Sequence, residues 1–291
     1  MRLDKMELIK NIDNLRKRIE EFKRKNYSLG LVPTMGYLHK GHASLIRQAK
    51  KENDIVIVSI FVNPKQFGPN EDLNTYPRDI ERDKKVAGEA GADIIFLPNA
   101  EEIYQDSCTS VEVEGELPKK LCGASRHIHF KGVTTIISIL FNIVQPDCAY
   151  FGQKDAQQVI IVKKMVHDLH YRINIRVCPI IRDTDGLAMS SRNTYLSQEE
   201  REQALSLNRS LKKAKLYSTS KAKDHGNITK LRQIIRNEIT CNPLAKIEYI
   251  EILDANTLKE MDELKVGRKA LVALAVRFGK TRLIDNTLLI E

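Results

Sequence analysis

Residues 29–42 read LGLVPTMGYLHKGH, an apolar run followed by a glycine-containing turn and two histidines. The apolar run at 29–33 predicts a short buried strand, and the apolar periodicity from about His42 to Lys51 predicts a helix. This stretch therefore predicts a strand, a loop and a helix in succession, which is the repeating unit of an α/β fold.

The alternation of strand and helix patterns continues to about residue 181. Residues 54–62 are almost continuously apolar and β-branched, as expected of a central parallel strand covered on both faces, and residues 92–97 repeat this pattern. Further along, the patterns predict a buried helix at 132–144, a strand at 149–152, a helix at 155–169 and a strand at 173–181. An amphipathic helix is predicted at residues 3–25. Together these segments predict a Rossmann-like, doubly wound parallel sheet.

The character of the sequence changes after about Thr184. Residues 197–200 read SQEE, a capping-box signature for a new helix, and a polar stretch covers 218–227. Three later strands are predicted at 247–253, 270–278 and 282–289, with a hairpin turn at 277–281. We therefore expect two domains, residues 1–182 with the parallel sheet and residues 183–291 as a smaller α+β domain.

Composition narrows the classes of function. Hydrophobic residues make up 42% of the chain and charged residues 29%, which is typical of a globular protein and not of a disordered one. The five cysteines are odd in number and contain no C-x-x-C pair, which argues against a disulfide framework or a zinc site. No apolar run reaches the roughly 18 residues that a membrane helix needs. We expect a cytoplasmic protein.

The net charge of +9 would suit nucleic acid, an acidic membrane surface or a small anionic substrate such as ATP. The basic residues are scattered through helix-like segments without interleaved aromatic residues, which favours a solvated surface over a nucleic-acid footprint. We therefore expect small-molecule substrates and neither a nucleic-acid nor a membrane partner.

Residues 34–42 are the strongest candidate for chemistry. They lie between a predicted strand and a helix start, where unpaired backbone N–H groups and the helix dipole favour an anion. His39 and His42 add donors, and Gly36 and Gly41 permit close approach of the backbone, so the segment suits a triphosphate. The alternatives are two surface histidines or a metal site, although no Cys, Asp or Glu completes a local ligand set.

Three other segments carry polar groups near strand ends. Residues 185–193 (DGLAMSSRN) combine two hydroxyl groups with a guanidinium group and would make an anion clamp, or alternatively a polar loop at a helix start. In residues 151–158 (FGQKDAQQ), Lys154 would suit phosphate and Asp155 ribose hydroxyls, although an ordinary helix start looks similar. Residues 61–68 (FVNPKQFG) offer an amide side chain to a polar substrate.

These segments taken together resemble a known family. The histidine pair after the first strand and the late Met-Ser-Ser-Arg are similar to the HIGH and KMSKS elements of the HIGH-motif nucleotidyltransferase superfamily. More specifically, the motifs at 33–42, 59–64, 76–78, 151–158 and 186–193 occur in the order and spacing of the pantothenate synthetase family. The resemblance is strong over about residues 25–200.

The resemblance implies an AMP-forming ligase that joins pantoate to β-alanine in two steps. Pantoate would attack the α-phosphorus of ATP to give pantoyl adenylate and pyrophosphate, and β-alanine would then displace AMP. It further implies Mg²⁺, a homodimer, and a C-terminal domain that acts as a lid over a nucleotide- and pantoate-binding domain. Little covalent chemistry is needed from the protein, because fixed donors stabilise the charge that gathers in the transition state.

The resemblance also implies roles for particular residues. His42 would be the proton-donating catalytic residue, with His39, Lys154 and Arg192 as catalytic partners at the phosphates. Gln66 and Gln158 would bind pantoate, with Gln66 also near β-alanine. The implied ATP-binding residues are Met35, Gly36, Tyr37, Leu38, His39, Lys40, Gly41, His42, Gly152, Gln153, Lys154, Asp155, Ile181, Met189, Ser190, Ser191 and Arg192. The metal ligands stay open, with Asp83 as a candidate.

The chain departs from the family pattern at two places. Gln153 stands where many members have Glu, and His127-Ile128 replace a common Pro-Gly pair. A Pro-Gly pair fixes a turn, so the loop around Arg126–His129 is expected to differ. Rival interpretations are an adenylyltransferase with another acceptor, an RNA-binding relative of the aminoacyl-tRNA synthetases, and a purely structural protein.

Overall fold

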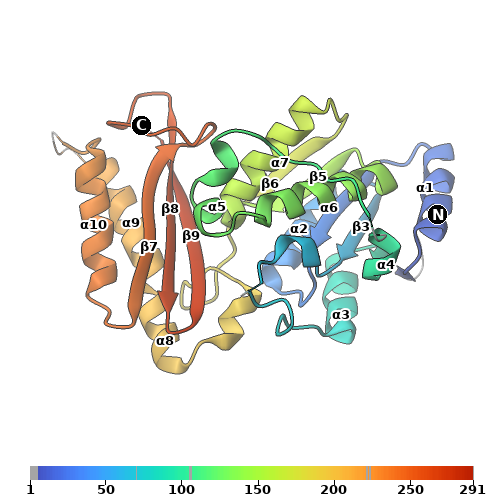
Figure 1. Ribbon diagram of the computed structural model, residues 1–291, viewed down its shortest axis with the longest axis horizontal. Coiled ribbons are helices and arrows are strands. Elements are labelled where there is room, and N and C mark those ends of the chain that lie inside the picture. Colours follow the sequence, from blue (N-terminus) through green and yellow to red (C-terminus); the bar gives the residue numbers. More distant parts are fainter. Residues whose placement is uncertain (1–5, 70, 105–106, 221, 223, 291) are drawn as a thin grey trace. The chain divides into compact units, whose positions relative to one another are not determined.

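The computed structural model describes residues 6–69, 71–104, 107–220, 222 and 224–290. These residues form two compact units (Figure 1). The first comprises residues up to 119 together with 123–179, and the second comprises 120–122 together with residues from 180 onward. The sequence predicted a change near residue 183 and did not foresee that the short segment 120–122 groups with the C-terminal unit.

The first unit is built on a six-stranded parallel sheet, which confirms the predicted doubly wound class; five of its strands were predicted. Its strand order is β1-β4-β3-β2-β5-β6, and every pairing among these described strands is parallel. The strands are β1 (Glu7–Ile9), β2 (Leu29–Thr34), β3 (Ile55–Ile60), β4 (Ile94–Phe96), β5 (Cys148–Gly152) and β6 (Asn174–Cys178).

Helices cover both faces of this sheet (Figure 1). The main helices are α1 (Ile12–Arg24), α2 (Lys40–Glu52), α3 (Ile80–Ala90), α6 (His129–Val144) and α7 (Ala156–Asp168). Helices α2 and α3 pack together on one face, and α1 and α7 pack beside α6 on the other. Shorter elements are η1 (Pro64–Gln66), α4 (Ala100–Ile103), η2 (Leu117–Lys119), α5 (Cys122–Ser125) and η3 (Gln153–Asp155).

The prediction of one N-terminal helix over residues 3–25 was partly wrong. Residues 1–5 lie outside the described residues, and Glu7–Ile9 form β1, so the helix begins only at Ile12. Strand β1 is a three-residue edge strand that pairs with β4. Local periodicity could not indicate it, because a short edge strand is stabilised by its partner rather than by its own sequence.

The second unit is a three-stranded antiparallel sheet covered by helices. Its strands are β7 (Ala245–Asp254), β8 (Lys269–Phe278) and β9 (Thr281–Ile290), and the predicted hairpin joins β8 to β9. Its helices are η4 (Ser191–Tyr195), α8 (Gln198–Ala204), α9 (Ser206–Ser218) and α10 (Ile228–Thr240). Residues from α9, α10 and the inner face of β8 form one buried core, which confirms the predicted α+β class.

Within the described part of the chain, none of the helices combines the length and apolar character needed to cross a bilayer.

Candidate active site

The strand order of the first unit defines where a ligand would bind. From β2 the chain passes to β3 and β4 on one side, whereas β5 and β6 lie on the other side of β2. The order therefore reverses between β2 and β5, and in doubly wound sheets ligands bind beyond the carboxyl ends of the strands at such a point. The loops after β2 and β5 carry the two leading sequence motifs.

A buried carboxylate fixes the backbone of the loop after β2. Asp83 of α3 accepts hydrogen bonds from the backbone N–H groups of Tyr37 (3.0 Å) and Leu38 (2.5 Å). Gly36 precedes them with φ +84°, and a Cβ there would lie 2.9 Å from Ile60 and 3.0 Å from the Asp83 carboxylate. Burial raises the pKa of Asp83 although these N–H donors act in the opposite direction. Both carboxylate oxygens are thus engaged in shaping the loop.

His39 and His42 form a reciprocal capping box at the start of α2. Nδ1 of His39 accepts from the N–H of Gly41 (3.1 Å), and Nδ1 of His42 accepts from the N–H of His39 (3.3 Å). Since an accepting nitrogen carries no proton, each neutral ring bears its proton on Nε2. The rings lie 4.0 Å apart between centroids. The box thus places two imidazoles at a helix N-terminus, where the dipole favours an anion.

His42 is held in its neutral form. Burial, together with the neighbouring charges of His39 and Lys154, lowers the pKa of His42 well below its ordinary value. The structure therefore brings Lys154, from the loop after β5, close to the histidine pair after β2. A neutral imidazole with Nε2–H is a hydrogen-bond donor at neutral pH.

The loop after β5 supplies Lys154 and Asp155 from η3. The Lys154 ammonium group lies 3.5 Å from the Asp155 carboxylate and is mostly buried, whereas Asp155 is exposed. Gly152 shows no steric need for glycine, because a Cβ there would meet no atom within 4 Å. Gln153 lies in the same turn, and Gln158 is partly buried one turn further along α7.

The 3₁₀ turn η1 after β3 positions Gln66. Its backbone packs directly on α6, where a Cβ on Gly132 would come within 2.3 Å of the Lys65 carbonyl oxygen. The Asn63 amide nitrogen bridges the Gly132 carbonyl (3.0 Å) and Oε1 of Gln66 (3.1 Å), and Nε2 of Gln66 lies 2.9 Å from Sδ of Met35. Gln66 is thus a buried amide beside the loop after β2.

A half-buried ionic network that the sequence interpretation missed supports the same turn. Arg126 makes a bidentate ion pair with Glu71 and donates to Nε2 of His129 (3.1 Å). His129 then donates from Nδ1 to the Gln66 carbonyl (3.0 Å). Burial and the charge of Arg126 lower the pKa of His129 to about 4, which keeps this ring neutral. The sequence feature that could have indicated this network is an Arg and a His three residues apart at the start of the buried helix α6.

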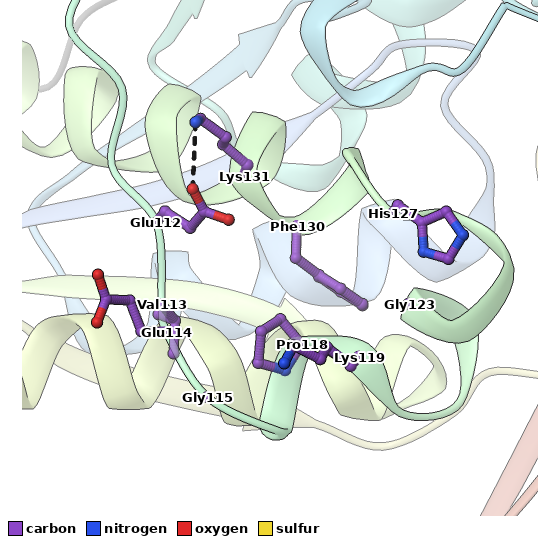
Figure 2. A pocket seen from close by; sticks show the side chains of 10 residues that line it. All are labelled: Glu112, Val113, Glu114, Gly115, Pro118, Lys119, Gly123, His127, Phe130 and Lys131. Atoms are coloured by element: carbon purple, nitrogen blue, oxygen red, sulfur yellow. Dashed lines mark ion pairs between the residues drawn. The ribbon is translucent and has the colours of Figure 1, made fainter.

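This network forms with His127-Ile128 at the place of the common Pro-Gly pair. Ile128 has φ −92°, an ordinary value for any residue, so glycine is not required there. His127 is exposed and lines a surface pocket of about 400 Å³ next to Phe130 and the ion pair between Glu112 and Lys131 (Figure 2). None of the predicted site residues lines this pocket.

The remaining predicted residues, Ile181 and Met189–Arg192, belong to the second unit. Met189 N–H donates to the Ile181 carbonyl (3.0 Å), and the Ser190 hydroxyl accepts from the N–H of Arg192 (3.3 Å) at the start of η4. Arg182 anchors the segment through a bidentate pair with the buried Asp285 (2.7 and 3.0 Å). The motif is therefore an ordered hairpin, and its part in the same site as the histidines stays a prediction.

The residues that the structure describes contain no group of three His, Cys, Asp or Glu side chains arranged to hold a metal ion. Asp83, the candidate ligand from the sequence, is already committed to two backbone donors.

A doubly wound sheet with two imidazole donors and a lysine at its switch point defines an α/β nucleotide-binding enzyme. The family model described as pantoate-beta-alanine ligase matches residues 7–288. The chain therefore belongs to the pantoate-beta-alanine ligase family, as the motifs predicted.

Individual relatives match over nearly their whole length. A pantothenate synthetase of Enterococcus faecalis is 53% identical over 282 residues, covering 97% of this chain and 98% of the relative. A solved pantothenate synthetase of Thermus thermophilus has a TM-score of 0.90 at 40% identity and covers 97% of this chain and 99% of its own. The pantoate-beta-alanine ligase of Francisella tularensis, solved with beta-gamma ATP and beta-alanine, has a TM-score of 0.78 at 36% identity, with 97% of each chain covered.

Proposed function

We propose that this chain is an ATP-dependent ligase that condenses pantoate with β-alanine to give pantothenate, through pantoyl adenylate, with release of pyrophosphate and AMP. Membership of the pantoate-beta-alanine ligase family supports the overall reaction. The observation that carries the nucleotide step is the capping box of His39 and His42 beside Lys154.

The geometry supports an electrostatic mechanism for the first step. The pantoate carboxylate would attack the α-phosphorus, and the negative charge that develops on the phosphate oxygens would meet the Nε2–H donors of His39 and His42 and the Lys154 ammonium group. His42, being neutral, would act as a hydrogen-bond donor to the transition state. Ser190, Ser191 and Arg192 would add hydroxyl and guanidinium donors to the triphosphate.

The substrate side of the site would be formed by Gln66 and Gln158. The Gln66 backbone is fixed by His129, and its amide by Asn63. An amide aimed at a substrate hydroxyl discriminates strongly, because an analogue without that hydroxyl leaves a buried polar group unpaired. Gly152, Asp155 and the backbone near Ile181 would hold the ribose and adenine.

Mg²⁺ is proposed as the ion that accompanies the triphosphate. It is usually held by substrate phosphates with only one or two carboxylates. The described residues offer no preformed carboxylate cluster, so the phosphate oxygens of ATP would supply most of the ligands to the ion. A homodimer and a cytoplasmic location complete the proposal. The homodimer rests on the family resemblance, and the location rests on the cysteine pattern, which argues against a disulfide framework.

The first test is to incubate the protein with ATP, Mg²⁺ and pantoate carrying oxygen-18 in its carboxylate. Attack on the α-phosphorus predicts one equivalent of pyrophosphate without β-alanine, and labelled AMP together with pantothenate once β-alanine is added. Formation of ADP and labelled phosphate would show that the intermediate is an acyl phosphate and not an adenylate. Failure to form any product with well-folded protein would exclude pantoate as the acceptor.

The pocket assignment is tested separately by substitution. Gln66→Ala and Gln158→Ala should each raise the pantoate KM about tenfold or more, since a lost hydrogen bond to a buried partner costs about 1–3 kcal/mol. The matched control is Gln157→Ala, because the amide of Gln157 donates to the Leu117 carbonyl (3.1 Å). Unchanged pantoate KM values in both test variants would reject the assignment.

A further inference from the structure

An exposed cysteine and a lysine from distant parts of the first unit lie in contact. Nζ of Lys65, in η1, lies 2.6 Å from Sγ of Cys108. The same ammonium group sits 4.7 Å above the ring of Tyr104, which positions it from the other side. Both Lys65 and Cys108 are exposed, so solvent and small oxidants reach them.

Both partners are fixed on one helix. The backbone of Lys65 packs against Gly132 of α6, where there is no room even for a Cβ. Three residues after Cys108, Val111 donates its N–H to Thr135 (3.0 Å), and its carbonyl accepts from the Thr134 hydroxyl (2.6 Å), so this segment is tied to the next turn of α6. The backbone of Lys65 and the segment just after Cys108 are therefore both held against α6.

We propose that Lys65 and Cys108 form an oxidation-sensitive pair that closes into a covalent nitrogen–sulfur crosslink when the protein meets a hydroperoxide. Oxidation by a peroxide begins at the thiolate form of a cysteine. Here the Lys65 nitrogen is in contact with the exposed sulfur that would be oxidised. This site lies outside the proposed ATP and pantoate contacts, and the crosslink does not depend on the proposed function.

The chemistry balances with peroxide as the sole oxidant. The thiolate sulfur attacks one peroxide oxygen, the O–O bond breaks, and hydroxide leaves, so that sulfur is oxidised by two electrons to the sulfenic acid. Hydroxide takes a proton from the Lys65 ammonium group. The free amine then attacks sulfur, forming the N–S bond as the S–O bond breaks and water leaves. The product has lost two hydrogen atoms relative to the reduced pair.

The crosslink should also affect the pantoate site; this part of the proposal rests on the proposed function. Tyr104, beneath the Lys65 ammonium group, donates from its hydroxyl to Oδ1 of Asn63 (2.8 Å), and Asn63 holds the amide of Gln66. Closing the pair would therefore fix η1, and with it Gln66, in one position. Oxidation should change the pantoate KM in the wild-type protein and leave it unchanged in Cys108→Ser.

The experiment treats the full-length protein with hydrogen peroxide and analyses peptides by mass spectrometry without reduction. The expected result is a Lys65–Cys108 crosslinked peptide pair that trypsin does not cleave after Lys65 and that dithiothreitol reverses. Dimedone, which traps sulfenic acids, should label Cys241, an exposed cysteine whose thiol donates to the Asn237 carbonyl (3.1 Å), and should label Cys108 far less.

The control variant is Lys65→Arg, which keeps the positive charge but has no nucleophilic amine. In this variant dimedone labelling of Cys108 should rise to the level of Cys241. The proposal is overturned if wild-type Cys108 accumulates as sulfenic or sulfinic acid while Lys65 stays unmodified. A crosslink that forms without any change in pantoate KM would refute the link to Gln66 and leave the crosslink standing.

Discussion

Nδ1 of His42 accepts a hydrogen bond from the backbone N–H of His39, 3.3 Å away, and this contact makes two potential catalytic side chains part of a helix cap. Each imidazole uses its Nδ1 to accept a hydrogen bond from a backbone N–H group. Structure and chemistry are therefore coupled at this point, and a substitution has to preserve the cap if it is to report on the chemistry.

Substitutions that keep the cap should separate these two roles. Asn is a favourable N-cap residue and Gln a favourable N3 residue, so His39→Asn and His42→Gln should retain stability within about 0.5 kcal/mol. Each removes an Nε2–H donor and should lower the rate of pantoate-dependent pyrophosphate exchange roughly 100- to 1,000-fold. Thermal unfolding and exchange kinetics measure the two effects. Normal exchange rates in both variants would show that the imidazoles serve only as caps.

Lys154 should influence the titration of His42. Lys154 and His39 both lower the pKa of His42, so Lys154→Met should raise it, and NMR titration of the imidazole protons would measure the change. The same variant should raise the KM for ATP, since a phosphate-binding charge is lost. Lys163→Met, which removes an equal charge from an exposed position of α7, is the control and should leave both values unchanged. An unaltered His42 titration in Lys154→Met would mean that the two side chains are not close.

Gly36 should be intolerant of a side chain for two separable reasons. Its φ of +84° disfavours any L-residue by about 1–2 kcal/mol, and a Cβ would in addition crowd Ile60 and the Asp83 carboxylate. Gly115 has φ +90°, and a Cβ added there would meet no atom within 4 Å, so this position isolates the first reason. Gly36→Ala should therefore destabilise the protein by about 1 kcal/mol more than Gly115→Ala, and should also raise the KM for ATP. Equal losses in chemical denaturation would contradict the packing of this loop on Asp83.

The buried His129 should make stability depend on pH. Its pKa is about 4 in the folded protein and near 6.5 when unfolded, so between these values the unfolded chain binds the proton more tightly. Stability should therefore fall as pH drops from about 6.5 to 4, by at most about 3 kcal/mol from this residue. His129→Gln, which retains a donor and an acceptor but does not titrate, should flatten this part of the profile in urea denaturation. A variant profile as steep as that of the wild type would assign the pH dependence to other groups.

The local sequence determined the elements and much of the candidate site. The parallel strands β2 to β6 and the C-terminal hairpin follow from apolar runs and turn residues, whose effects act over a few positions, whereas the edge strand β1 does not. The two histidines were predicted as donors at a helix start, whereas their capping box was not predicted, because the helix was expected from about His42 and begins at Lys40.

Only the tertiary structure decided which distant residues meet. Lys154 approaches His42 because β5 lies beside β2 in the sheet, and strand order is not encoded in local periodicity. The ion pair of Arg126 with Glu71 and the contact of Lys65 with Cys108 likewise join segments separated by more than 40 residues. Such contacts depend on the burial of whole helices and sheets, and a local pattern carries no information on which partner the fold will bring near.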